Sequence, residues 1–334
     1  MLKIFSSDSA NNVWKAAFTA LTKEEKPQLE SRLGLATEIR PAILQIQNPL
    51  NRWVVARVPE LNPAFALAEV IWILAGRDDT AFLEHWFSRY AKFVGGSGTQ
   101  HAAYGARLRR HFRLDQLGRA YEALRSKETS RQVVLQIWSA YDDLPNTDGT
   151  PRAGDIPCNI CSCLKVRNRQ LHWLQVMRSN DVDRGLPHNI IQFTMLQEIL
   201  AGWLDLEVGD YTHIADSLHF YTTDRESRID DIVEPIVSQN RFKLGFADTA
   251  MQLQILVNWL DELRVGSVSR EQMIDKVDGV SGAFDDIRLV LVADHLRKLK
   301  EFERASSVMA RCTNPAYVQC WDRWLNRLQH ASEG

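Results

Sequence analysis

The chain has 334 residues, of which 45% are hydrophobic, and its 40 lysines and arginines stand against 42 acidic residues. That length is enough for about two domains, and the formal net charge of −2 gives no reason to expect a nucleic-acid-binding protein. No apolar run reaches the roughly 18 residues that a membrane span requires. The N-terminal residues do not have the pattern of a secretory signal, and five cysteines are an odd number for a disulfide scaffold. We therefore expect a reduced, cytoplasmic protein with neither a membrane nor a nucleic acid as its partner.

The first third of the sequence contains one helix that is apolar on nearly all sides. Asn62 and Pro63 open it and Gly76 follows its last apolar residues, as is typical of a helix start and end. A helix of this kind should be buried, so its single carboxylate, Glu69, stands out. The pattern leaves two possibilities for Glu69: one half of a buried ion pair with an arginine, or a group with a function.

The middle of the chain alternates between predicted strands and helices. We expect a loop and a basic segment at 92–113, a helix at 114–127, strands at 131–139, 159–167, 170–178 and 211–221, a turn-rich loop at 142–157, and a helix after Pro187. From about residue 225 the pattern becomes mostly helical, most clearly at 248–265 and 283–312. The sequence thus predicts an α+β core in residues 1–224 and a helical C-terminal extension in residues 225–334.

Three of the five cysteines lie close together, as Cys158, Cys161 and Cys163. A metal site would need a second cluster of ligands, and the remaining Cys312 and Cys320 lie in the helical extension, so we predict no metal. On a strand, Cys161 and Cys163 share one face and are expected to be small core residues. Cys158 lies at the boundary between a loop and a strand, where a thiolate can be exposed and activated by nearby cations.

Several motifs resemble the thymidylate synthase family, which includes the pyrimidine nucleotide hydroxymethylases. The resemblance rests on Pro157-Cys158, the run MRSNDVDRGLPHNI at 177–190 and HFY at 219–221. Five further matches occur upstream in the same order: Ser31-Arg32-Leu33-Gly34, Glu69-Val70-Ile71-Trp72, Tyr104-Gly105, Asp115-Gln116-Leu117 and Ser130-Arg131. The resemblance covers about residues 30–224 and implies a mixed β-sheet core packed with helices, a homodimer and a one-carbon transfer.

The resemblance implies three catalytic residues. Cys158 would add to C6 of a pyrimidine nucleoside monophosphate, which makes C5 able to attack the one-carbon unit of 5,10-methylenetetrahydrofolate. Glu69 corresponds to a glutamate that moves protons at C5 and O4, which favours the functional alternative for this carboxylate. Tyr104 would support the same site.

The resemblance also implies how the nucleotide phosphate is bound. Arg178 and Ser179 would bind it, together with Arg32 from an N-terminal loop and with Arg131 donated by the partner of a homodimer. A bidentate arginine cluster suits a phosphate dianion. The family usually has two consecutive arginines where this chain has Arg131 and then a glutamine. Arg107, Arg109 or Arg110 could supply the missing positive charge.

The remaining implied contacts concern the base, the sugar and the folate. Asn189 would bond the O4 and N3 edge of the pyrimidine, which favours uracil. His219 and Tyr221 would bind the sugar hydroxyl, and Asp181 and Trp72 would contact the folate. The sequence favours synthesis of dTMP from dUMP. The alternative is a 5-hydroxymethylase of dUMP, dCMP or CMP, in which water replaces hydride, because the family's closing C-terminal tail is absent here. A third alternative is a binding protein that keeps the fold but lacks activity.

Overall fold

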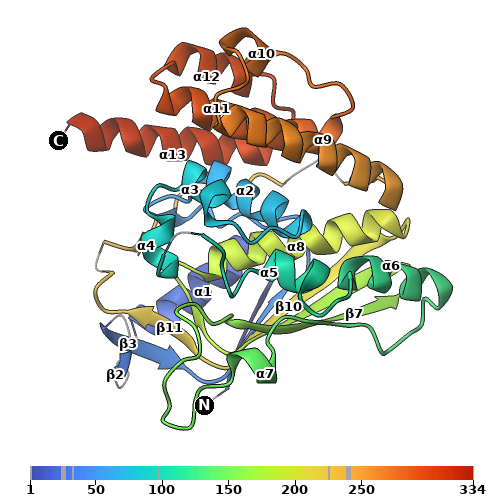
Figure 1. The fold of residues 1–334 in the computed structure, drawn as a ribbon. Helices are drawn as coiled ribbons and strands as arrows, with labels where there is room; N and C mark the ends of the chain where they lie inside the picture. Colours follow the sequence, from blue (N-terminus) through green and yellow to red (C-terminus); the bar gives the residue numbers. More distant parts are fainter. Residues whose placement is uncertain are drawn as a thin grey trace.

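The computed structural model describes residues 2–23, 28–31, 34–96, 98–224, 226–237 and 242–333. Helices and strands are mixed along the chain, and the strands form mixed sheets, so the predicted α+β fold is confirmed (Figure 1). The predicted site residue Arg32 lies outside the described residues.

The main sheet has six strands, in the order β1 (Lys3–Ser7), β4 (Ala42–Ile46), β10 (Glu207–Ala215), β8 (Gln170–Met177), β7 (Asn159–Arg167) and β6 (Val134–Gln136). A second sheet contains β2 (Gln28–Ser31), β3 (Gly34–Ile39), β11 (Leu218–Tyr221) and β9 (Asn180–Asp181), and β5 (Arg57–Val58) pairs with β12 (Arg228–Ile229). In the main sheet β8 and β10 are parallel, whereas β7 and β8 are antiparallel.

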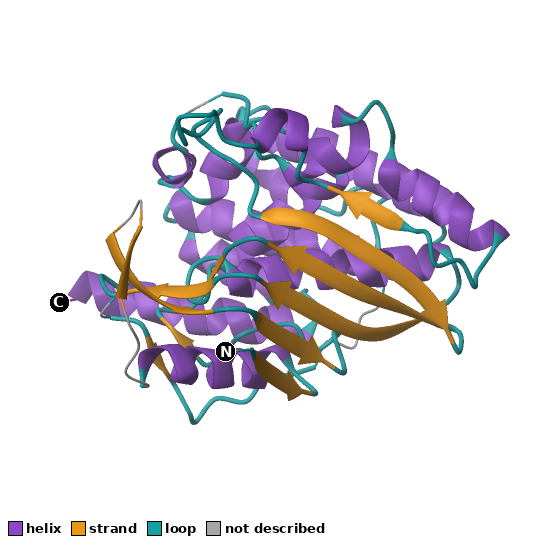
Figure 2. Ribbon diagram, turned by 90° about the horizontal axis from the view of Figure 1, so that it is seen from below, coloured by secondary structure: helices purple, strands orange, loops and turns teal. Residues whose placement is uncertain are grey.

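The two faces of the main sheet differ. Helix α8 (Leu186–Trp203) connects the parallel strands β8 and β10, as a crossover of this kind requires. It packs on the face where Trp173 and Tyr211 are buried. Side chains of the other face, such as Cys163, Leu174 and Ile214, stay partly exposed. Figure 2 views the sheet from this second side, where the described part of the chain places no helix.

Most of the helices before α8 lie around its N-terminal half, whereas α6 (Gln116–Ser126) lies beside its C-terminal end, where Tyr121 packs against Trp203 (Figure 1). The helices before α8 are α1 (Ala10–Thr22), α2 (Pro63–Leu74), α3 (Thr80–Trp86), α4 (Tyr90–Val94), α5 (Tyr104–Ala106), a π-helix at Arg107–His111, α6 and α7 (Ala140–Asp143). The helices predicted after Asn62 and at 114–127 are therefore confirmed as α2 and α6.

Two of the predicted strands needed correction. The strand predicted at 211–221 is two strands, because the chain bends at Asp216 and Ser217 and β11 then joins a different sheet from β10. The strand predicted at 131–139 is shortened to β6, and the chain turns at Ser139 into α7. The strands at 159–167 and 170–178 are confirmed as β7 and β8.

The C-terminal part is helical, as predicted. It comprises α9 (Phe246–Arg264), α10 (Arg270–Ile274), α11 (Gly282–Lys298), α12 (Phe302–Met309) and α13 (Pro315–Glu333). These helices lie above α2 and α3 in Figure 1, and they share one hydrophobic core with the first part of the chain. Polar contacts join the parts as well: Arg77 bonds Asp261 at 2.6 Å, and His85 Nε2 lies 2.9 Å from His295 Nδ1. The division at residue 224 stays a prediction.

Candidate active site

Cys158 lies where the loop after α7 enters β7, and its side chain is partly buried. Since Asn159 pairs with Met177 across the antiparallel strands, Cys158 lies opposite Arg178 at the end of the sheet. The Arg178 backbone N–H donates to the Cys158 carbonyl at 2.8 Å. Its guanidinium donates to the carbonyls of Pro157 and Ile156 at 2.9 and 3.0 Å, and its Nη2 lies 3.9 Å from the Cys158 sulfur. A cation held at this distance favours a negative charge on the sulfur.

Tyr104 lies close to the same sulfur. Its helix, α5, crosses α2 with the two backbones in direct contact at Gly105 and Ile73. A Cβ added to Gly105 would stand 2.8 Å from both the Cα and the carbonyl oxygen of Ile73, so only glycine fits this crossing. Burial raises the pKa of Tyr104 well above its ordinary value, and the neighbouring charge of Cys158 adds to this effect. The structure therefore brings Tyr104 and Cys158 together.

Glu69 is the one residue of α2 that is not fully buried. The helix begins where predicted, since the Asn62 side chain accepts hydrogen bonds from the first turn at 3.0 and 3.2 Å. The partner of Glu69 is His188, whose Nδ1 lies 2.7 Å from Glu69 Oε2. Among the described residues, Glu69 therefore pairs with a histidine and not with an arginine, which was one of the two alternatives. Nearby, burial and then the charge of Glu69 raise the pKa of Tyr90.

Asn189 lies in the first turn of α8 and is buried. Its Oδ1 accepts a hydrogen bond from Asn180 at 2.7 Å, and its Nδ2 donates one to Gln192 at 3.1 Å. Asn180 and Gln192 are themselves buried. In this arrangement the Asn189 oxygen faces Asn180 and its amide nitrogen faces Gln192.

Asp181 holds a turn together with only one of its carboxylate oxygens. Oδ1 accepts from the backbone N–H groups of Asp183 and Arg184 at 2.7 and 2.8 Å. Oδ2 is buried and has no hydrogen-bond partner among the residues that the structure describes. Burial raises the pKa of Asp181 to about 6. This carboxyl group is therefore suited to an N–H donor from a ligand.

His219 and Tyr221 follow on β11, beside Asp181. His219 pairs with Asp181 across β11 and β9, and the rings of His219 and Tyr221 meet edge-on with centroids 5.0 Å apart. Burial lowers the pKa of His219, which favours a neutral ring. The Arg184 guanidinium covers Tyr221 at 5.3 Å from the ring centroid.

Two predicted residues lie apart from this cluster. Trp72 is 4% exposed and its indole N–H donates to the Asp79 carbonyl at 3.0 Å, so this ring is part of the core. Arg131 is exposed and precedes β6, where the Val133 carbonyl accepts from the Leu164 N–H. Leu164 is six residues beyond Cys158, so Val133 lies roughly 20 Å from Cys158 at about 3.3 Å per residue. Because β6 and β7 are antiparallel, Arg131 lies at the end of β6 that is farther from the Cys158 of its own chain.

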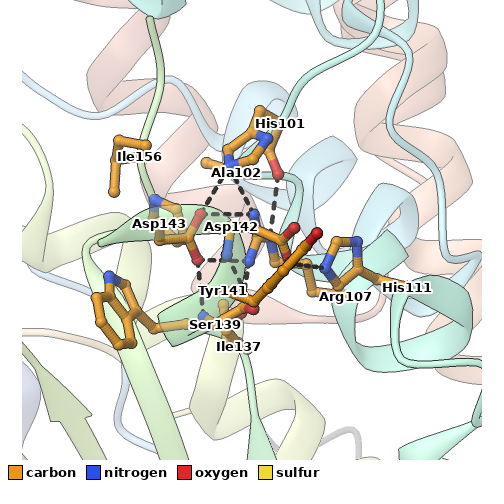
Figure 3. Close-up of polar contacts among 12 residues, drawn as sticks. His101, Ala102, Arg107, His111, Ile137, Ser139, Tyr141, Asp142, Asp143 and Ile156 are labelled. Carbon is orange, nitrogen blue, oxygen red and sulfur yellow. Dashed lines mark hydrogen bonds and ion pairs between the residues drawn. The ribbon is translucent and has the colours of Figure 1, made fainter. Parts of the chain in front are cut away.

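A buried cluster fixes the loop that leads to Cys158. Arg107 bonds both oxygens of Asp143, at 2.6 and 2.9 Å, and His101 Nε2 lies 2.6 Å from the same carboxylate (Figure 3). Further along the loop, Asp155 accepts from the Ala102 N–H at 3.2 Å. Arg107 is 1% exposed, so the suggestion that it replaces the missing phosphate cation is wrong.

Sequence reasoning missed His188, Asn180 and Gln192. The sequence did contain a signal for His188, because it is a polar residue directly before Asn189 near the start of a mostly apolar helix. Among the described residues, no group of three or more His, Cys, Asp or Glu side chains is arranged to hold a metal ion. All five cysteines lie in described segments, and none forms a disulfide. In those segments, no helix combines the length and apolar character that crossing a bilayer demands.

Comparison with known proteins agrees with the resemblance. The chain is 35% identical over 214 residues to the deoxyuridylate hydroxymethyltransferase of Bacillus phage SP01, which is 61% of this chain and 55% of that protein. It is 32% identical over 164 residues to the protein of the same name from Pseudomonas phage M6, covering 48% and 45%. It is 31% identical over 163 residues to the "Putative thymidylate synthase" of Methanosarcina barkeri, covering 48% and 70%. The chain thus spans about half the length of the two phage relatives.

The family model for thymidylate synthase matches residues 55–258, which include Glu69, Cys158 and Asn189 and extend into α9. The match covers more than half of the chain. The chain therefore belongs to the thymidylate synthase family.

Proposed function

We propose that the chain transfers a one-carbon unit to C5 of a pyrimidine nucleoside monophosphate, with Cys158 adding to C6. The observation that carries this proposal is the Cys158 sulfur 3.9 Å from the Arg178 guanidinium. A pyrimidine is a poor carbon nucleophile until a thiolate adds across its 5,6 double bond, and Arg178 favours that thiolate. Because the thiol must stay reduced, a cytoplasmic location suits the reaction.

The substrate that we propose is dUMP. Uracil presents an acceptor at O4 and a donor at N3, and cytosine presents the reverse, so an amide must flip to change between them. Flipping Asn189 alone would set its NH₂ group against that of Asn180 and its oxygen against that of Gln192. We therefore expect Asn189 to favour one of the two bases, and the names of the deoxyuridylate relatives support uracil.

The phosphate and sugar contacts follow from the same assignment. Arg178, Ser179 and Arg32 bind the phosphate, and His219 and Tyr221 bind the sugar hydroxyl. Arg131 serves the site of a second subunit in a homodimer, since it lies far from its own Cys158. The uncovered face of the main sheet, with its partly exposed apolar side chains, is the surface that would form that dimer.

The cosubstrate that we propose is 5,10-methylenetetrahydrofolate, which would supply the one-carbon unit. Asp181 fits this role, because its buried Oδ2 accepts no hydrogen bond from the described residues and a pterin ring offers N–H donors. Glu69 handles protons at C5 and O4, and Tyr104 lies beside the sulfur.

We further propose that the product is 5-hydroxymethyl-dUMP. The sequence alone favoured dTMP, but the deoxyuridylate hydroxymethyltransferase of Bacillus phage SP01 matches over 214 residues at 35% identity, against 163 residues at 31% identity for the Methanosarcina barkeri relative. Thymidylate synthesis stays the second candidate, because the chain covers 70% of that relative.

The folate product separates these candidates. The protein is incubated with dUMP and methylenetetrahydrofolate, and the folate and nucleotide products are separated by chromatography. Tetrahydrofolate with hydroxymethyl-dUMP is the expected result, whereas dihydrofolate with dTMP would establish the synthase instead. Turnover by Cys158→Ala at the wild-type rate would refute the covalent mechanism. Asn189→Asp should gain activity on dCMP, because a carboxylic acid there can accept from the cytosine amino group.

A further inference from the structure

His188 precedes Asn189 in the first turn of α8, and it contacts the carboxylate of Glu69. Its Nδ1 lies 2.7 Å from Glu69 Oε2, which is within hydrogen-bond distance. One turn before Glu69, the ring of Phe65 packs edge-on against the imidazole with centroids 5.2 Å apart. Since α2 and α8 pack against each other in the core, the contact is fixed by two rigid helices.

The surroundings of this pair differ from those of the fully buried His213. The side chains of His188 and Glu69 are 15% and 13% exposed, so apolar groups enclose most of the pair while water reaches part of it. By contrast, His213 is fully buried and bonds Tyr211 within the core. A partly enclosed imidazole–carboxylate pair is suited to accept a proton from a water molecule and to hold it.

We propose that His188 and Glu69 form a proton relay that deprotonates the water added to the one-carbon unit at C5. This inference rests on the hydroxymethyl transfer proposed above. In this relay, His188 positions the Glu69 carboxylate and helps to hold the proton that Glu69 takes from the water molecule.

The step conserves atoms and electrons. The water oxygen bonds to the exocyclic methylene carbon on C5, and the electrons of that double bond move towards C4 to form an enolate at O4. The water proton passes to Glu69 and is held between Glu69 Oε2 and His188 Nδ1. The enolate then restores the C4 carbonyl and the C5–C6 double bond, and the C6–S bond breaks to release the Cys158 thiolate. No oxidant or reductant is needed.

Two substitutions distinguish a relay from a structural contact. His188→Phe keeps a ring against Phe65 but removes both nitrogens. His188→Asn places an amide N–H near the position of Nδ1, so it keeps a hydrogen bond to Glu69 but cannot take up a proton. His111→Asn is the matched control, because His111 pairs with Asp142 at 3.1 Å in an exposed position. The full-length proteins are compared for kcat, KM, folate and nucleotide products, and the dissociation constant of dUMP by calorimetry.

We expect both His188 variants to lose about 10²-fold in kcat for hydroxymethyl-dUMP, with KM and the dUMP dissociation constant changed by less than about twofold. The His111→Asn control should match the wild type. Wild-type kcat in either His188→Asn or His188→Phe would overturn the relay, and so would a loss that lies in dUMP binding. If the wild type itself produces dihydrofolate and dTMP, the proposed function fails and the relay fails with it. Tetrahydrofolate from the wild type with unaffected variants overturns the relay alone.

Discussion

Replacing Arg107 by methionine should destabilise the protein strongly. Its guanidinium forms two hydrogen bonds with Asp143 and also donates to the backbone carbonyls of His101 and Ile137, at 3.0 and 2.9 Å. Methionine keeps the length and apolar stem of the side chain but leaves the Asp143 carboxylate buried without its main cation.

The expected magnitude follows from burial. The side chains of Arg107 and Asp143 are 1% and 0% exposed, and removing one member of such a pair costs about 3–5 kcal/mol. Asp143 keeps His101 and the Ser139 N–H, so we expect the lower end, about 3 kcal/mol. At roughly 2–4 °C per kcal/mol, the melting temperature should fall by about 6–12 °C.

Urea unfolding of single and double variants tests this reasoning. Asp143→Asn removes the charge, so combining it with Arg107→Met should cost clearly less than the sum of the two single losses. The control is Arg109→Met, because Arg109 pairs with Asp115 at 3.0 Å with side chains 28% and 41% exposed, and such pairs contribute about 0–1 kcal/mol. Additive losses within about 0.5 kcal/mol would refute the claim that Arg107 compensates a buried charge.

The pH dependence gives a second check on the same pair. Burial by itself would raise the pKa of Asp143, but the Ser139 N–H, Arg107 and His101 outweigh it and hold the pKa below its ordinary value. Stability from this carboxylate is therefore present above the unfolded pKa of about 3.9 and is lost as the pH falls below it. The difference in unfolding free energy between wild type and Arg107→Met should narrow in that acid range.

Two further predictions concern the site itself. The pKa of Asp181 is raised to about 6, so the native state loses stability as pH rises from about 4 to 6, and Asp181→Asn should stabilise the protein by up to about 3 kcal/mol at pH 8 but not at pH 4. Equal urea midpoints of the wild type and Asp181→Asn at both pH values would contradict this prediction. We also expect Asp181→Asn to bind folate more weakly than the wild type. Gly105→Ala places a Cβ 2.8 Å from the Ile73 backbone, which should cost about 1–3 kcal/mol and lower kcat by displacing Tyr104. An unchanged urea midpoint and an unchanged kcat would show that the crossing of α5 and α2 can accommodate a Cβ atom at residue 105.

Much of the fold near the site could be predicted from local patterns. The helix α2 was recognisable because Asn62 and Pro63 begin it and apolar residues cover all its sides, which also isolated Glu69. The strands β7 and β8 and the position of Cys158 at a loop–strand boundary followed from alternation and turn residues. These signals depend on neighbours within a few positions of the sequence.

Contacts between distant segments were not predictable in this way. Glu69 was compatible with an arginine partner until the packing of α2 on α8 brought it to His188, 119 residues away. The run at 211–221 looked like one strand, since alternation does not indicate which sheet a strand joins. Arg107 was one of three arginines in a basic segment that could have replaced a phosphate-binding cation, but Asp143 binds it in the core.

The sequence by itself indicated an α+β protein with a cysteine at the boundary between a loop and a strand, because periodicity and turn chemistry act locally. It also carried the motifs of the thymidylate synthase family. Only the tertiary structure decided which polar side chains pair with each other, since the partners of Glu69, Asn189 and Asp143 are set by how helices and strands pack. It also decided that the helices of residues 246–333 share one core with α2, because apolar faces are buried against whichever element the fold brings to them.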